Sequence, residues 1–241
     1  MKPKPGTGYA VPGTVCAVVV AGGTGSRLKS RIRKPFVRLA GRPMLAWTLR
    51  AFERAPGVGA VVLVAHPRDV AAARALAKRW RCGKVAAVVA GGETRMASVA
   101  RGLAALPPGA KWVAVHDAAR PLVTPEVIAR TVREARRWKA AIAAVPVVPT
   151  VKQAKGAWVR RTLDRSTLWA VQTPQVFERG LLERAHRRAN GGAPATDDAA
   201  LVERIGGRVR IVTGSHSNLK VTTPEDLIVA QSLLKKHSQR R

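Results

Sequence analysis

The chain has 241 residues, 46% of them apolar, which is enough to bury the core of one α/β domain or of two small ones. Lysine and arginine number 43 against 14 acidic residues, and the resulting formal net charge of +29 predicts attraction to anions without informing on the fold. The two cysteines are far apart and form no CxxC pair, which excludes a zinc knuckle and a disulfide scaffold. No apolar run approaches the length of a membrane span, and residues 1–14 lack the apolar core of a signal peptide. We therefore expect a reduced, soluble, cytoplasmic protein.

Short runs of β-branched residues alternate with longer segments of helical periodicity along most of the chain. Residues 15–20 (VCAVVV) are continuously apolar and lead into a Gly-rich turn, which is typical of a strand buried on both faces. Further strands are expected at residues 60–65, 85–89, 112–115, 140–145 and 208–212. Helices are expected at residues 43–55, 68–80, 95–106, 125–138, 178–189, 197–205 and 224–235. This alternation predicts an α/β fold, namely a Rossmann-like, mostly parallel sheet with helices on both faces and right-handed crossovers.

Residues 146–172 interrupt this alternation. Two prolines, Pro146 and Pro149, precede two short extended segments that meet near Gly156. A two-stranded ribbon is seldom stable unless it docks on something, so we expect an inserted β-hairpin arm that reaches onto a partner subunit. A loop without such a role is the alternative. The expected organisation is one domain over residues 15–236 with 146–172 as a dimerisation arm, and basic, mobile tails at 1–14 and 237–241.

The Gly-rich turn after the first strand is the sharpest local signal. Residues 21–27 are Ala-Gly-Gly-Thr-Gly-Ser-Arg, and Lys34 follows. Glycines let the backbone approach a ligand closely and direct N–H groups at phosphate oxygens. The loop is neither a Walker A motif, because no Gly-Lys-Ser/Thr follows, nor a dinucleotide fingerprint, because Leu28 stands where the third glycine belongs. Arg27 and Lys34 beside it suit a triphosphate whose α-phosphate takes up charge during attack, and a tight turn with two solvated cations is the alternative.

Further segments make a resemblance specific. They are GGETR (91–95) with Ser98, VHDAARP (115–121), LDR (163–165), QTPQ (172–175), ATDD (195–198) and NLKVT (218–222). Together with the Gly-rich loop, and in this order, they resemble sugar nucleotidyltransferases and, among these, the 2-C-methyl-D-erythritol 4-phosphate cytidylyltransferase family of the non-mevalonate isoprenoid pathway. The likeness runs from about Val15 to Leu234.

The resemblance implies a reaction in which the phosphate of methylerythritol phosphate attacks the α-phosphorus of CTP and releases pyrophosphate. A phosphomonoester has its second pKa near 6 and is mostly ionised at neutral pH, so no general base is required. The remaining demand is positioning and charge neutralisation. The resemblance also implies Mg²⁺ as cofactor and a homodimer.

The family pattern assigns roles to individual residues. Backbone contacts to CTP are implied for Ala21, Gly22, Gly23 and Gly25. Recognition of cytosine and ribose is implied for Gly92, Glu93 and Ser98, with a loop and helix N-cap as the alternative. Catalytic roles are implied for Arg27, Lys34, Asp117, Arg165 and Lys220. Acceptor binding is implied for Asp117, Arg120, Thr150, Arg165, Thr173 and Lys220.

Asp117 is the candidate Mg²⁺ ligand, and an Asp117–Arg120 ion pair that braces the strand end is the alternative. In the family, the residues corresponding to Thr150 and Arg165 reach the substrate of the neighbouring subunit. Two positions depart from the pattern: Pro35 stands where the family usually has Gln, and Pro149 stands where an acid is common.

Two other functions compete with this reading. A ribitol 5-phosphate cytidylyltransferase, or one using another sugar or alditol phosphate, would share the CTP loop, because the arm sets the choice of acceptor. A nucleic-acid-binding protein is suggested by the charge of +29, but the basic residues are dispersed and the chain has only one Tyr and three Phe for base stacking. We therefore expect non-specific RNA adhesion and no specific nucleic-acid partner.

Overall fold

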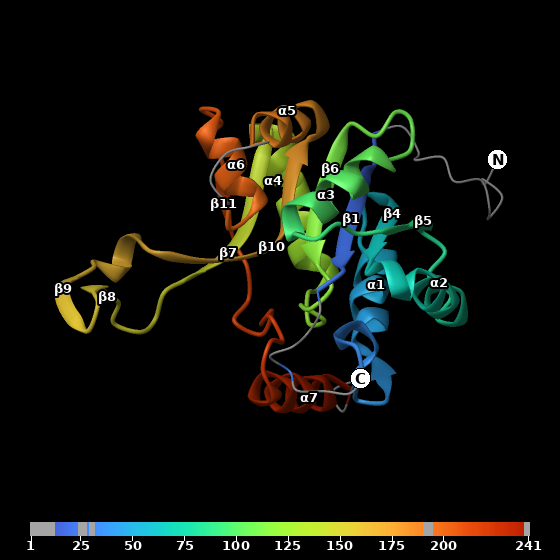
Figure 1. Ribbon diagram of the computed structural model, residues 1–241, viewed down its shortest axis with the longest axis horizontal. Helices are drawn as coiled ribbons and strands as arrows, with labels where there is room; N and C mark the ends of the chain where they lie inside the picture. Colours follow the sequence, from blue (N-terminus) through green and yellow to red (C-terminus); the bar gives the residue numbers. More distant parts are fainter. Residues whose placement is uncertain (1–12, 24–27, 29–31, 190–194, 239–241) are drawn as a thin grey trace.

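The centre of the fold is a mixed sheet (Figure 1). Its strands are β1 (Val15–Ala21), β4 (Val58–Ala65), β5 (Val85–Ala90), β6 (Trp112–Asp117), β7 (Ala140–Pro146), β10 (Trp169–Glu178) and β11 (Arg210–Thr213). Within the part of the chain that the structure describes, these seven strands follow the order β11-β7-β10-β6-β1-β4-β5. The computed structural model describes residues 13–23, 28, 32–189 and 195–238. The α/β fold expected from the alternation is confirmed.

Strand β10 was not expected from the sequence. It runs antiparallel to both neighbours, β6 and β7, while the other pairs in the sheet are parallel. Its polar centre, Gln172 to Gln175, breaks the apolar pattern, and Pro174 argues against a central strand. The structure accommodates both features, because the register with β7 shifts between Val171 and Gln175 and the buried glutamines are hydrogen-bonded.

Alternate side chains of β1 pack into two separate hydrophobic cores, because successive side chains of a strand point to opposite faces of the sheet. Val15, Ala17 and Val19 face helices α1, α2 and α4, while Cys16 and Val18 face α3, α5 and α6. The bounds of these helices are α1 Met44–Arg54, α2 Val70–Arg79, α3 Arg95–Ala104, α4 Pro125–Trp138, α5 Arg179–Ala189 and α6 Asp198–Arg204. The sheet is therefore covered by helices on both faces, as expected (Figure 1).

A third, smaller core lies at the end of the molecule where α7 (Pro224–Ser238) packs (Figure 1). Helix α7 contributes Ala230 and Leu234, which share a cluster with Leu39 of the short pair β2 (Arg38–Leu39) and β3 (Arg42–Pro43). The short helix η2 (Lys34–Phe36) stands next to this pair in the chain. Packing of α7 against β2 therefore keeps the segment before α7 on the same side of the molecule as Lys34.

The expected hairpin is present and projects from the body of the molecule (Figure 1). Strands β8 (Lys152–Lys155) and β9 (Trp158–Thr162) pair antiparallel and are joined through Gly156, whose φ of +56° favours glycine. All residues of both strands are exposed. Because β7 extends to Pro146 and β10 begins at Trp169, the projecting segment is residues 147–168, shorter than expected; we call it the arm.

Both cysteines, Cys16 and Cys82, are buried and unpaired. Burial raises the pKa of the Cys16 thiol to about 12 and that of Cys82 to about 11, so both thiols stay protonated near neutral pH. Within the described residues, no helix is both long enough and apolar enough to cross a bilayer.

Candidate active site

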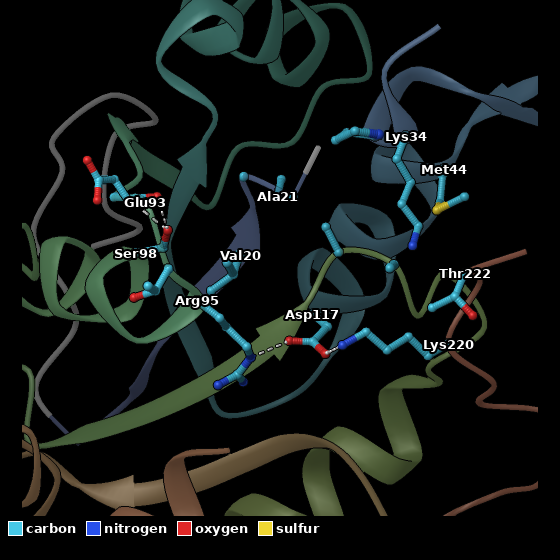
Figure 2. Close-up of a pocket in the computed structure, with 17 residues that line it drawn as sticks. Val20, Ala21, Lys34, Met44, Glu93, Arg95, Ser98, Asp117, Lys220 and Thr222 are labelled. Atoms are coloured by element: carbon cyan, nitrogen blue, oxygen red, sulfur yellow. Dashed lines mark hydrogen bonds and ion pairs between the residues drawn. The ribbon is translucent and has the colours of Figure 1, made fainter. Parts of the chain in front are cut away.

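A cavity of about 350 Å³ opens at the carboxyl ends of β1 and β6, where open α/β sheets bind their ligands. Its walls come from β1 and the glycines after it, from the loop between β5 and α3, and from η2, α1 and the segment before α7 (Figure 2). The residues singled out in the sequence that line it are Ala21, Gly22, Gly23, Lys34, Gly92, Glu93, Ser98, Asp117 and Lys220. The fold thus gathers the first three residues of the expected CTP loop, the expected nucleoside loop and two of the expected cations around one cavity.

Asp117, the last residue of β6, lies between two cations in this cavity (Figure 2). Its Oδ1 accepts a hydrogen bond from Arg95 Nε at 3.0 Å, and its Oδ2 lies 2.6 Å from Lys220 Nζ. Burial disfavours the charge of this carboxyl, but attraction to Arg95 and Lys220 outweighs burial and holds the pKa of Asp117 well below its usual range. Asp117 is therefore a fixed carboxylate that orients the Lys220 ammonium.

Arg95 connects Asp117 to a second buried carboxylate. Its Nη1 donates to Asp198 Oδ2 at 2.7 Å, and Asp198 Oδ1 lies 3.0 Å from His186 Nε2. Burial opposes the charge of Arg95, yet the two carboxylates raise its pKa above the ordinary arginine value. Both Arg95 and Asp198 belong to motifs quoted from the sequence, but the sequence analysis assigned neither a role. The sequence does not show that the segments carrying Arg95, Asp117 and Asp198 meet in the fold.

The loop before α3 is shaped by Ser98. Its Oγ accepts the Gly92 N–H at 3.1 Å and donates to the Gly92 carbonyl at 3.3 Å. A Cβ on Gly91 would stand 2.8 Å from the same Oγ, so this close approach requires glycine. The helix itself is capped by Thr94, whose hydroxyl accepts a backbone N–H three residues on. Ser98 is therefore not the helix N-cap that the alternative interpretation expected. Glu93 is exposed and lines the cavity.

Thr173 and Arg120 contact the backbone of Asp117 but are not among the residues that line the cavity. Thr173 Oγ1 accepts the Asp117 backbone N–H at 3.1 Å. The Arg120 guanidinium donates to the backbone carbonyl of Asn218 at 2.7 Å, and burial lowers its pKa. Asp117 forms its ion pairs with Arg95 and Lys220 rather than with Arg120, so the bracing ion pair considered as an alternative is wrong.

Comparisons with known proteins identify the family of the chain. A sequence model of the 2-C-methyl-D-erythritol 4-phosphate cytidylyltransferase family matches residues 15–236. The chain belongs to this family. Cytidylyltransferases of that name from Desulforamulus reducens and Pelotomaculum thermopropionicum are 44% identical over 229 residues and 47% identical over 224 residues, respectively. These alignments cover 94% of this chain and 98% of the first relative, and 92% of this chain and 94% of the second.

Solved structures give the same result. The crystal structure of a 4-diphosphocytidyl-2C-methyl-D-erythritol synthase from Anaerococcus prevotii matches with a TM-score of 0.83 at 29% identity, covering 95% of this chain and 97% of that one. The 2-C-methyl-D-erythritol 4-phosphate cytidylyltransferase from Thermus thermophilus matches with a TM-score of 0.74 at 34% identity, covering 93% of this chain and 100% of that one. The fold is thus that of the cytidylyltransferase family.

Besides Arg120 and Thr173, the arm residues that the family pattern selects do not line this cavity. Thr150 and Arg165 are exposed on the arm, where Arg165 donates to the Val148 carbonyl. Gly25 and Arg27 lie outside the described residues. The described chain therefore gathers nine of the selected residues around one cavity and leaves Thr150 and Arg165 apart from it.

The two departures from the family pattern have different surroundings. Pro35 is buried in η2, lines the cavity next to Lys34, and suits the first turn of a short helix, where its missing N–H is not needed. Pro149 precedes Thr150 in an exposed part of the arm. Pro35 therefore leaves Lys34 in place.

A site made by the protein alone does not fit Mg²⁺ here. Within the described residues, no three or more His, Cys, Asp or Glu side chains gather in a metal-binding group. Both carboxylate oxygens of Asp117 already contact cations. Mg²⁺ is commonly held by one or two carboxylates together with substrate phosphates, and only that arrangement fits Asp117.

Proposed function

We propose that the chain transfers CMP from CTP to 2-C-methyl-D-erythritol 4-phosphate, giving 4-diphosphocytidyl-2-C-methyl-D-erythritol and pyrophosphate for isoprenoid precursor synthesis. The observation that carries this proposal is the cavity in which Lys34, Lys220 and the glycines after β1 surround Asp117. A glycine-lined cavity with fixed cations suits two phosphorylated substrates whose charge increases in the transition state. Membership of the cytidylyltransferase family supports the identity of the acceptor.

The chemistry needs no proton transfer from the protein. An acceptor phosphate oxygen forms a bond to the α-phosphorus of CTP, the bond from that phosphorus to the bridging oxygen breaks, and pyrophosphate leaves. The acceptor phosphate is already ionised near neutral pH, so the protein has only to position both substrates and neutralise charge. Lys34 and, from its motif, Arg27 would neutralise the triphosphate, which the backbone of residues 21–23 and Gly25 would hold.

The acceptor would bind on the other side of Asp117. Lys220 would contact the acceptor phosphate, and the 2.6 Å ion pair with Asp117 sets where its ammonium stands. Arg120 and Thr173 would complete this side next to Asp117, while Gly92, Glu93 and Ser98 would contact cytosine and ribose. In Figure 2, Glu93 and Ser98 lie on one side of Asp117, and Lys34 and Lys220 lie on the other.

Mg²⁺ is part of the proposal. Asp117 would be its protein ligand, together with phosphate oxygens of CTP. When bound, the ion would neutralise part of the triphosphate charge.

We also propose a homodimer in which each arm covers the cavity of the partner subunit. Trp158 and Val159 of the arm are 82% and 62% exposed, and such apolar exposure on a projecting ribbon suits a docked state. Thr150 and Arg165 would then meet acceptor held by the other chain. A self-complementary exchange of this kind is what two-fold symmetry produces.

The substrate is tested by pyrophosphate release from CTP with methylerythritol phosphate, with ribitol 5-phosphate and without acceptor. We expect methylerythritol phosphate to be used at least about tenfold better, a difference of about 1.4 kcal/mol in transition-state binding. Equal or faster turnover with ribitol 5-phosphate would make the alternative acceptor correct.

Non-specific RNA adhesion and a cytoplasmic location stay predictions. Adhesion should disappear at moderate salt while CTP turnover persists.

A further inference from the structure

A buried histidine stands next to Asp117 and has no place in the chemistry above. His116 has 0% exposure and lies within β6. Its Nδ1 is 2.9 Å from Thr173 Oγ1, and its Nε2 is 3.4 Å from the Arg120 carbonyl oxygen. Its ring meets Phe52 edge to face, with 5.0 Å between the ring centroids. The histidine therefore contacts the backbone or side chain of two residues that flank Asp117 in space.

The protonation of His116 follows from these contacts. Complete burial favours the neutral imidazole, in which one ring nitrogen donates a hydrogen bond and the other accepts one. The Arg120 carbonyl can only accept, which places the ring proton on Nε2. Nδ1 must then accept from the Thr173 hydroxyl, and the Thr173 oxygen is left to accept the Asp117 N–H.

These bonds form a closed circuit around the turn that follows β6. The Asp117 N–H donates to Thr173, Thr173 donates to His116, and His116 donates to the Arg120 carbonyl. The Arg120 N–H donates back to the Asp117 carbonyl at 2.9 Å. Each of the four hydrogen bonds has a fixed donor and a fixed acceptor. The orientation of the neutral imidazole therefore fixes the backbone conformation of the turn, from which the Asp117 carboxylate and the Arg120 guanidinium project.

We propose that His116 is a positioning residue for the acceptor side of the site, acting through Thr173 and the Arg120 carbonyl to hold the turn at residues 117–120. The inference rests on the proposed function, because it assigns the acceptor phosphate to Lys220 and Arg120. It predicts a larger effect on acceptor binding than on CTP, since Lys220 and Arg120 are assigned to the acceptor and the CTP loop follows a different strand, β1.

The test separates KM for the two substrates in variants of the full-length protein. His116→Phe keeps the ring and its packing on Phe52 but removes both hydrogen bonds, and should raise the acceptor KM at least about tenfold and the KM for CTP clearly less. His116→Asn is the matched control, because its amide oxygen can stand near the Nδ1 position and accept from Thr173. It should restore the acceptor KM to within about threefold of wild type.

Two outcomes would overturn the proposal: an unchanged acceptor KM in His116→Phe, or an equal rise in both KM values. If His116→Phe does not fold, His116→Gln replaces it. Its longer amide can donate to Arg120 but leaves the Thr173 hydroxyl without its acceptor, so it should show the larger KM effect and His116→Asn the smaller one. The reverse order would contradict the circuit. Failure of the proposed function is distinguishable, because wild type would then not release pyrophosphate with methylerythritol phosphate.

Discussion

Asp117 is the residue on which the charges of the site converge. A buried carboxylate left without any cationic partner would cost roughly 3–5 kcal/mol, and Arg95 and Lys220 both stabilise the charged form of Asp117. Arg95 also pairs with Asp198, which is 1% exposed. The two carboxylates thus hold one guanidinium rigid at the edge of the cavity. In a chain of net charge +29, the two carboxylates of Asp117 and Asp198 therefore fix the positions of the Arg95 and Lys220 side chains.

The two lysines of the cavity should affect different kinetic constants. Lys34→Ala should lower kcat by roughly 10²–10³, because a cation beside the triphosphate acts mainly on charge that develops in the transition state. Lys220→Ala should raise the acceptor KM by about one to two decades and leave CTP binding, measured without acceptor, nearly unchanged. Steady-state kinetics and calorimetry measure both. Lys78→Ala on the exposed face of α2 removes the same charge and should change neither constant.

His116 should also make the folding stability depend on pH. Its pKa of about 3 in the folded protein lies below the 6.5 of an unfolded histidine. Below pH 6.5 the unfolded chain therefore binds a proton at this histidine and the native state does not. The free energy of unfolding falls as the pH drops from 6.5 towards 3. Between pH 8 and pH 5 the contribution of His116 is a loss of about 2 kcal/mol, since each pKa unit corresponds to 1.36 kcal/mol.

Denaturant titrations at pH 8 and pH 5 measure this difference. His116→Asn should lose less stability than wild type between these two pH values. Asp117 does not interfere in this window, because its lowered pKa leaves it ionised in both states above pH 5. His216→Asn, at an exposed position, is the control and should keep the wild-type pH dependence. An identical slope in wild type and His116→Asn would show that His116 is protonated in the folded protein.

At the scale of elements, apolar periodicity predicted most of the sheet but not the strand that completes the site. Val15–Ala21 and Val58–Ala65 are buried on both faces and are visible as continuous apolar runs. The buried part of β10 carries Gln172, Thr173 and Gln175, whose side chains are satisfied by partners far away in the sequence. A strand stabilised by such contacts has no periodic signature, because its pattern depends on the tertiary fold.

The same limit applies to the site. The motifs placed Asp117, Lys34 and Lys220 in one cavity correctly, since loops at the carboxyl ends of neighbouring strands meet in an α/β fold. Arg95 and His116 were within quoted motifs, but their roles follow from hydrogen bonds across 22 and 57 positions in the sequence. Geometry alone could assign those roles.

Helix α3, which carries Arg95 and Ser98, approaches the sheet at Gly102. A Cβ there would lie 2.9 Å from Val64 Cγ2 and closer still to Val18, both in the sheet. Gly102→Ala should therefore destabilise the fold by about 1–3 kcal/mol despite the better helix propensity of alanine. Thermal or urea denaturation measures this. Gly180→Ala in α5, where the nearest atom is the flexible end of Arg184 at 3.5 Å, is the matched control and should stabilise by up to about 1 kcal/mol.

At the scale of the whole molecule, charge and shape impose opposite demands on assembly. Each chain carries a net charge of +29, which opposes association unless the interface is apolar or screened by anions. The arm supplies apolar surface at Val148, Trp158 and Val159, each more than half exposed. The proposed dimer therefore concentrates its contacts on the arm, at a distance from the body of its own chain (Figure 1).

Arg165 on the arm and Lys220 at the cavity allow a direct test of sharing between subunits. If the arm acts on the partner's cavity, an Arg165→Ala homodimer and a Lys220→Ala homodimer should each be nearly inactive at acceptor concentrations below the wild-type KM. Mixing them in equal amounts and allowing subunit exchange should restore activity, because each heterodimer has one site with both residues intact and one with neither. Statistical exchange makes half of the dimers mixed, so about one quarter of wild-type sites should return. No recovery despite exchange shown by native mass spectrometry would place Arg165 at the cavity of its own chain, and the arm would then have to fold back.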